Sequence, residues 1–116
     1  YPYLLVQGEA GIGKSHLLAH LSKKLRDENH IIYLFLGQFF TKNEDPWHQI
    51  LNDLEVTNSV DNFLRSISNK AKETKKRAFI IIDALNEGEG KRLWGNYFQS
   101  FINHIKKYSN IALIFS

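Results

Sequence analysis

The stretch that decides the fold is Gly8-Glu9-Ala10-Gly11-Ile12-Gly13-Lys14-Ser15, near the start of a 116-residue chain. It matches the pattern G-x-x-x-x-G-K-[ST] in full, and we call it the phosphate loop. Its glycines let the backbone wrap closely around phosphate oxygens, because no Cβ stands in the way. The wrapped backbone directs its N–H groups inward, and the following helix adds the positive end of its dipole. The motif therefore predicts a site for the phosphates of a nucleoside triphosphate.

The residues on both sides of the phosphate loop fit the strand–loop–helix context that this motif requires. The apolar run 3–6 predicts a buried strand. From Lys14 onward, leucines recur at helical spacing, at Leu17, Leu18, Leu21 and Leu25. A chance glycine-rich turn is the alternative, and its frequency in a chain of this length is on the order of a few in a thousand.

Three more apolar runs predict strands, at 31–36, 78–82 and 111–115. Between them, helices are predicted to begin at Asp45-Pro46, at Ser59 or Asp61, and near Leu93. Strands that are apolar on both faces and alternate with helices favour a mainly parallel sheet. We therefore expect an α/β fold: a three-layer P-loop NTPase core with four strands, whose tryptophans and phenylalanines lie in the core.

An acidic residue that holds Mg²⁺ is expected at the end of a strand next to the phosphate loop. Asp83 meets this requirement, because it directly follows the apolar run 78–82. We expect Lys14 to reach the β- and γ-phosphates, and Ser15 and Asp83 to bind Mg²⁺. The alternative for Asp83 is an ordinary turn or helix cap.

Asn86 and Glu87, which follow Asp83 in the chain, are candidates for catalysis. Glu87 could polarise the attacking water as a general base, and Asn86 could orient that water or contact the phosphate. Asn, Glu and Gly are also common in plain turns, and that alternative stays open for both residues.

The composition excludes several other chemistries. There is no cysteine, so disulfides and thiolate catalysis are excluded. No run approaches the roughly 18 apolar residues of a membrane span, so no membrane partner is expected. The net charge is +3, with basic clusters at 70–77 and 106–107 that we expect to be solvated, so nucleic acid is an unlikely partner. The chain begins without Met and stops after an apolar run, which suggests part of a single domain from a larger protein.

The block Asp83-Ala84-Leu85-Asn86-Glu87-Gly88, followed by Leu93-Trp94, resembles the STAND class of ATPases, close to its NACHT branch. The likeness is strongest to the bacterial antiphage Avs (AVAST) group. The phosphate loop, the segment 36–47 and the segment 110–116 agree with it, so the resemblance covers nearly the whole chain. NACHT proteins often carry Asp-Glu where this chain has Asn86-Glu87, which weakens a claim of fast hydrolysis.

The resemblance implies a P-loop core in which the fourth strand lies between the first and third. It implies a slow Mg²⁺-dependent ATPase in the cytoplasm, in which ATP binding supports a switch from monomer to homo-oligomer. In the antiphage group, other regions of the protein recognise a viral protein and carry the effector. Ser116 would be the polar residue of the sensor strand.

Two other functions remain open. One is an AAA+-like ATPase motor or loader that acts on nucleic acid, and the other is a nucleotide clamp with little hydrolysis. Flanking sequence would separate the first of these from a STAND protein, which should continue into a helical region and long repeats.

Overall fold

The computed structural model describes residues 3–5, 14–83 and 90–116, and it describes side chains in 16–83 and 91–116. The elements follow the predicted order. They are β1 (Tyr3–Leu5), α1 (Lys14–Asp27), β2 (Ile31–Leu36), the 3₁₀ turn η1 (Gly37–Phe39), α2 (Pro46–Asp53), α3 (Val60–Glu73), β3 (Ala78–Asp83), α4 (Gly90–Ile105) and β4 (Ile111–Phe115).

The four strands form one sheet in the order β1-β4-β3-β2, and all three pairings are parallel. The expected insertion of the fourth strand between the first and third is confirmed. β3 and β4 are central and almost wholly buried, which suits their Ile-rich and Phe-containing sequences. β2 is an edge strand.

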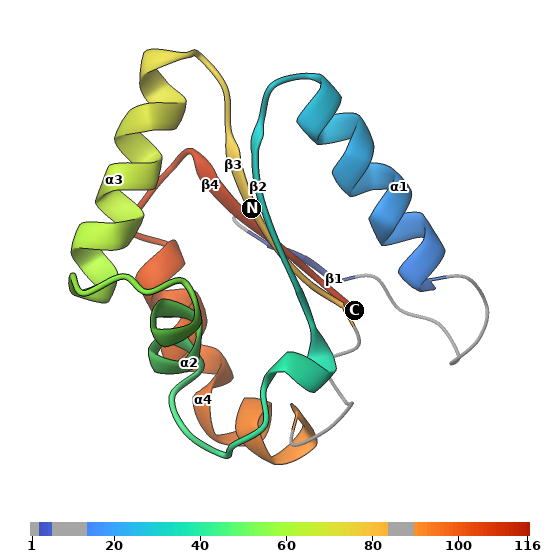
Figure 1. Cartoon of the computed structure of the whole chain (residues 1–116), viewed down its shortest axis with the longest axis vertical. Helices are drawn as coiled ribbons and strands as arrows, with labels where there is room; N and C mark the ends of the chain where they lie inside the picture. Colours follow the sequence, from blue (N-terminus) through green and yellow to red (C-terminus); the bar gives the residue numbers. More distant parts are fainter. Residues whose placement is uncertain (1–2, 6–13, 84–89) are drawn as a thin grey trace.

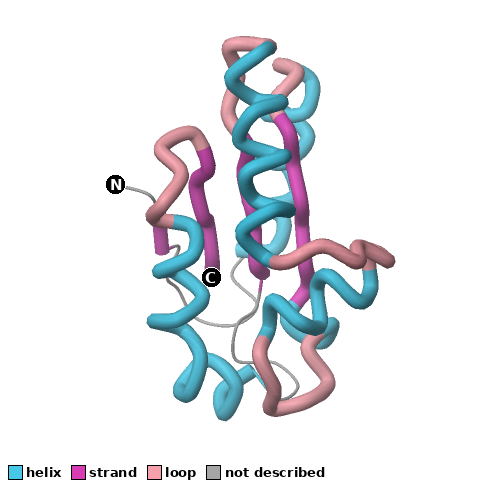
Figure 2. The backbone as a smooth tube through the Cα atoms, turned by 90° about the vertical axis from the view of Figure 1, so that its left-hand side faces the viewer, coloured by secondary structure: helices cyan, strands magenta, loops and turns pink. Residues whose placement is uncertain are grey.

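Helices cover both faces of the sheet, so the fold is the predicted three-layer α/β architecture (Figure 1). α1 packs on one face, where Leu18, Ile81 and Ile114 form a small buried cluster. α2, α3 and α4 pack on the other face, where the larger core holds Trp47, Trp94 and most of the described phenylalanines. Figure 2 shows the same layers from the side.

Three leucines depart from the sequence-based expectation. Leu17 is 55% exposed, although it was assigned to the apolar face of its helix. Leu18, Leu21, Ser22 and Leu25 form the face of α1 that turns to the sheet, and Leu17 lies one step to its side. Leu34 and Leu36 are 40% and 47% exposed, so the prediction that this strand is buried on both faces is wrong. β2 lies at the edge, where α1 covers only part of its face.

The helix starts follow local capping chemistry. The Asp45 carboxylate accepts a hydrogen bond from the Trp47 N–H at 2.9 Å, and Pro46 takes the first helical position. Ser59 caps α3, since its hydroxyl oxygen accepts from the Asn62 N–H at 3.2 Å. This decides between the two starts that the sequence left open.

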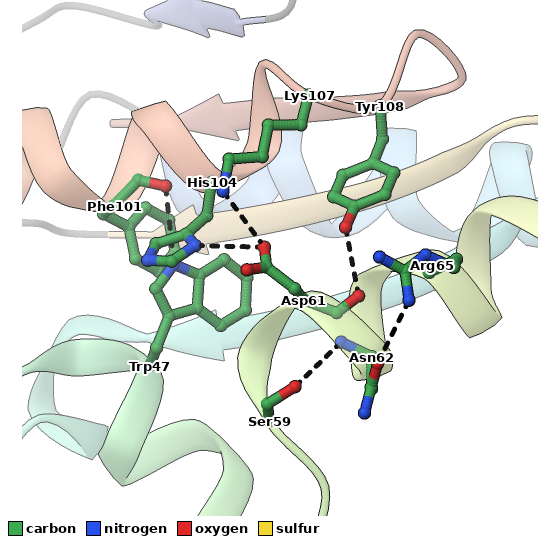
Figure 3. Close-up of polar contacts among 9 residues, drawn as sticks. All are labelled: Trp47, Ser59, Asp61, Asn62, Arg65, Phe101, His104, Lys107 and Tyr108. Carbon is green, nitrogen blue, oxygen red and sulfur yellow. Dashed lines mark hydrogen bonds and ion pairs between the residues drawn. The ribbon is translucent and has the colours of Figure 1, made fainter.

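A polar cluster joins the beginning of α3 to the end of α4 (Figure 3). The Asp61 carboxylate lies 3.4 Å from His104 Nδ1 and 3.3 Å from Lys107 Nζ. The Tyr108 hydroxyl donates to the Asp61 carbonyl at 3.0 Å. The hydrogen bond to His104, assisted by Lys107, holds the pKa of Asp61 below its usual value of 3.8.

None of the described helices is long and apolar enough to cross a membrane.

Candidate functional site

The carboxyl ends of three parallel strands lie side by side at one edge of the sheet. Leu5 of β1 pairs with Phe115 of β4, and Phe115 pairs with Ile82 of β3. The phosphate loop begins three residues after Leu5, and Asp83 directly follows Ile82. In parallel α/β sheets, ligands bind in the crevice outside this edge. The chain therefore brings Leu5, which precedes the phosphate loop by three residues, and the predicted metal-binding carboxylate of Asp83 to the same edge.

Asp83 is held firmly in place at the end of β3. It is 5% exposed, and its Oδ1 accepts a hydrogen bond from the Ser116 hydroxyl at 3.0 Å. The backbone N–H of Ser116 donates to the Ile82 carbonyl at 3.0 Å, which extends the β3–β4 ladder by one bond. A buried carboxylate needs such partners, because burial without them is costly. The sheet register and the serine together fix the position of this carboxylate.

The position of Asp83 suits a magnesium–phosphate site. Magnesium prefers oxygen ligands, and at phosphate sites it uses only one or two carboxylates besides water and phosphate oxygens. A carboxylate can accept several bonds, so the hydrogen bond from Ser116 leaves capacity for a metal. Among the described residues, no group of three or more His, Cys, Asp or Glu side chains could form a metal site by itself. One carboxylate with remaining acceptor capacity, as at Asp83, fits a site at which phosphate and water supply the other oxygen ligands.

Much of the predicted site lies outside the described residues. This applies to Gly8, Glu9, Ala10, Gly11, Ile12 and Gly13 of the phosphate loop, and to Asn86 and Glu87. Lys14 and Ser15 are described by their backbone only, as the first two residues of α1. The helix therefore begins at the predicted lysine, as the motif requires. Figure 1 shows this end of α1 on the same side of the molecule as the end of β4.

A buried tryptophan, Trp94, follows Asp83 by eleven residues in the chain. Trp94, in the second turn of α4, is 7% exposed and contacts the rings of Phe40 and Phe101 edge-on, with centroids 5.3 and 5.0 Å away. Its indole N–H has no hydrogen-bond partner among the described residues. Buried donors usually have partners, so this N–H is an exception among the described residues.

Sequence reasoning named Ser116 only through the family resemblance. Its bond to Asp83 joins positions 33 residues apart, so local periodicity could not reveal it. The one sequence clue is that Asp83 and Ser116 each follow an apolar run directly. Two such polar residues at the ends of neighbouring parallel strands are expected to meet.

The comparisons with known proteins agree with this geometry. No curated protein matches the chain. The profile of a protein family described as an AAA domain matches residues 2–114. Because this match spans nearly the whole chain, the protein belongs to the AAA domain family of nucleotide-binding ATPases.

Proposed function

We propose that this chain is the ATP-binding and ATP-hydrolysing switch module of a STAND-type signalling or antiviral defence protein. The observation that carries the proposal is the buried Asp83, which is hydrogen-bonded to Ser116. Asp83 lies at the carboxyl ends of the parallel strands, and β1, which precedes the phosphate loop in the chain, ends on the same side of the sheet. The resemblance of the block 83–88 and of Leu93-Trp94 to the STAND class supports the finer assignment.

Each residue of the proposed site has a separate task. Backbone N–H groups of Gly8–Gly13 surround the phosphates, and the Lys14 ammonium neutralises the β- and γ-phosphate charge. The Ser15 hydroxyl and the Asp83 carboxylate hold Mg²⁺. When bound by these two residues, Mg²⁺ would supply positive charge that offsets the charge developing on the phosphate oxygens.

Hydrolysis is assigned to the residues just beyond Asp83. Glu87 accepts a proton from the attacking water, and Asn86 orients that water. A neutral amide at position 86 gives one carboxylate fewer than many NACHT proteins have. Slow turnover suits a switch, because the ATP-bound state must persist long enough to assemble.

The switch itself involves the protein that surrounds this domain. ATP binding supports homo-oligomer formation, a separate region recognises a viral protein, and another region carries the effector. The cytoplasm is the proposed location, because ATP and Mg²⁺ are abundant there.

A second candidate is an AAA+-like ATPase that loads onto or moves along nucleic acid. The AAA domain match supports it as well as it supports the STAND assignment. A nucleotide clamp with little hydrolysis is the third candidate, and it keeps the same phosphate and metal ligands.

Replacing Lys14 tests nucleotide binding. We expect Lys14→Ala in the intact protein to weaken ATP binding by at least about tenfold, because a charge-assisted contact to phosphate is lost. Isothermal titration with ATP and Mg²⁺ measures the affinity. Lys24→Ala is the matched control, since this exposed lysine lies in the last turn of the same helix. Equal affinity of Lys14→Ala and the wild type would refute the phosphate site.

Replacing Glu87 separates a hydrolysing switch from a clamp. We expect Glu87→Gln to retain ATP affinity and to lower steady-state hydrolysis by a factor on the order of 10² or more, because the general base is lost. Phosphate release measures turnover, and the exposed Glu73→Gln serves as the control. Unchanged turnover in Glu87→Gln would show that another group is the base. If the wild type binds ATP without turnover, the clamp is correct.

A further inference from the structure

Positive charge collects at the end of the molecule opposite the candidate nucleotide site. We define this basic end as residues 23–30, 70–77 and 106–110, which lead into β2, β3 and β4. It carries ten of the fifteen Lys and Arg residues but only three of the twelve Asp and Glu residues, a net charge of +7, or +6 when Asp61, which pairs with Lys107, is included. The rest of the chain carries five cations and nine anions, a net charge of −4. The overall +3 thus conceals a strongly polarised molecule.

Backbone pairing brings these three distant segments together. Ile31, Ala78 and Ile111 are aligned in neighbouring strands, so the residues before them meet at one edge of the sheet. Figure 1 shows the turns that precede β2 and β3 next to each other. Nine of the ten cationic side chains are exposed and Lys76 is partly exposed. The sequence showed separate clusters, whereas the fold brings them to the same end of the sheet.

Hydrogen bonds make the basic end a fixed surface. The Arg77 N–H donates to His30 Nδ1 at 3.0 Å, and the Arg77 guanidinium donates to the Ser109 carbonyl at 3.4 Å. The Asn110 side-chain amide donates to the Ser68 carbonyl at 2.7 Å, which ties α3 to the turn before β4. These bonds fix the turns that carry the lysines and arginines, whereas the exposed side chains keep rotamer freedom that binding would restrict.

One lysine of this surface occupies a backbone position that favours glycine. Lys75 has a φ of 56°, and it follows α3 as the left-handed residue of the helix end. A non-glycine residue is strained in this conformation. Asn29 and Glu55 follow α1 and α2 in the same conformation, so the left-handed residue is a helix end shared by three described helices, and the proposal rests on the charge of Lys75.

We propose that the basic end binds the phosphate backbone of a nucleic acid. A dense, exposed set of Lys and Arg side chains is the electrostatic footprint of such a partner. Membrane binding by a basic surface usually adds exposed apolar residues that enter the lipid headgroup layer. The large exposed hydrophobic side chains of the described residues are Leu17, Leu34 and Leu36, and all three lie outside the basic end. Charge without an apolar anchor favours phosphodiesters over lipid.

This inference does not depend on the proposed ATPase function. The six residues of β3 separate the basic end from Asp83 by about 20 Å, so nucleic acid at one end leaves the other end open. A nucleic-acid contact here would serve both an AAA+-like loader and a switch that senses nucleic acid.

Titration of the intact protein with a fluorescein-labelled 20-bp DNA duplex tests the proposal, with anisotropy recorded at several salt concentrations and without ATP. The test variant replaces Lys72, Lys75 and Lys76 with Gln. The control variant replaces Lys42, Arg65 and Lys91 with Gln, which removes the same charge from exposed positions elsewhere. We expect at least about tenfold weaker binding by the test variant, and a salt slope smaller by about 2 to 3, since each phosphate contact contributes roughly 0.9.

Three results would overturn the proposal. The first is no binding of duplex or single-stranded DNA or RNA by the wild type at 50 mM salt. The second is an equal loss in both variants, which would mean general charge attraction only. The third is binding to phosphatidylserine vesicles without binding to nucleic acid. Thermal melts check the folding of both variants, and the double variant Lys72→Gln, Lys76→Gln repeats the test without altering the left-handed position.

Discussion

At the scale of single residues, Lys75 combines a strained backbone conformation with an exposed positive charge. Its N–H donates to the Lys72 carbonyl at 3.1 Å, and the N–H of Lys76 donates to the Ala71 carbonyl at 2.9 Å. This pattern closes α3 and requires a left-handed residue at position 75. Lysine adopts that conformation only with strain, because its Cβ approaches a carbonyl oxygen.

We therefore expect Lys75→Gly to raise the free energy of unfolding by about 0.5–1 kcal/mol, because glycine relieves the strain and loses part of the gain to its greater freedom in the unfolded chain. Urea unfolding measures the change. Lys72→Gly is the control and should lower stability by about 1 kcal/mol, since it lies in the last turn of the helix. If Lys75→Gly were the less stable of the two, the assigned strain would be wrong.

At the scale of elements, an ionised carboxylate links the start of α3 to the end of α4. His104 and Lys107 of the α4 end both reach Asp61, and they lower the pKa of Asp61 (Figure 3). The folded chain therefore binds this proton less tightly than the unfolded chain does. The resulting stability is complete above pH 3.8 and is lost as the pH falls through the lower pKa of the folded state.

We expect Asp61→Asn to remove this part of the acid sensitivity. The midpoint of thermal unfolding should fall less between pH 5 and pH 2.5 in the variant than in the wild type, because the amide has no proton to gain. Asp53→Asn, at an exposed position on α2, is the control and should follow the wild-type curve. Parallel curves for Asp61→Asn and the wild type would mean that the ion pair contributes no pH-dependent stability.

The elements also show which features a sequence can predict. Apolar runs located β2, β3 and β4, and capping residues located α2 and α3, because these features depend on neighbours in the chain. The exposure of Leu34 depends on strand order, and the bond between Asp83 and Ser116 depends on register. Periodicity holds no information on either, and the strand order was expected only from the family resemblance. The roles of the phosphate loop, Asn86 and Glu87 remain predictions.

At the scale of the whole molecule, the two faces of the sheet are unequally supported. The face toward α2, α3 and α4 buries a cluster of eighteen residues, with Trp47 and Phe101 stacked at 4.5 Å. On the face toward α1, the residues whose side chains are described bury a smaller cluster, Leu18, Ile81 and Ile114. Burial of apolar side chains is the main favourable term in folding, so among the described residues α1 rests on a smaller apolar cluster than α4 does.

We expect α1 to open more readily than α4 does. Without nucleotide, amides in 18–26 should exchange with deuterium at least about tenfold faster than amides in 93–104 of α4, which corresponds to an opening free energy lower by about 1.4 kcal/mol. Mass spectrometry of peptides after timed labelling measures both segments. ATP with Mg²⁺ should then slow exchange in α1 more than in α4, because Lys14 and Ser15 of the proposed site begin that helix. If α1 were as protected as α4 without nucleotide, the small cluster would hold it as firmly as the large one holds α4. Nucleotide binding could then not act by stabilising a weakly packed α1, and the switch would have to act through another element.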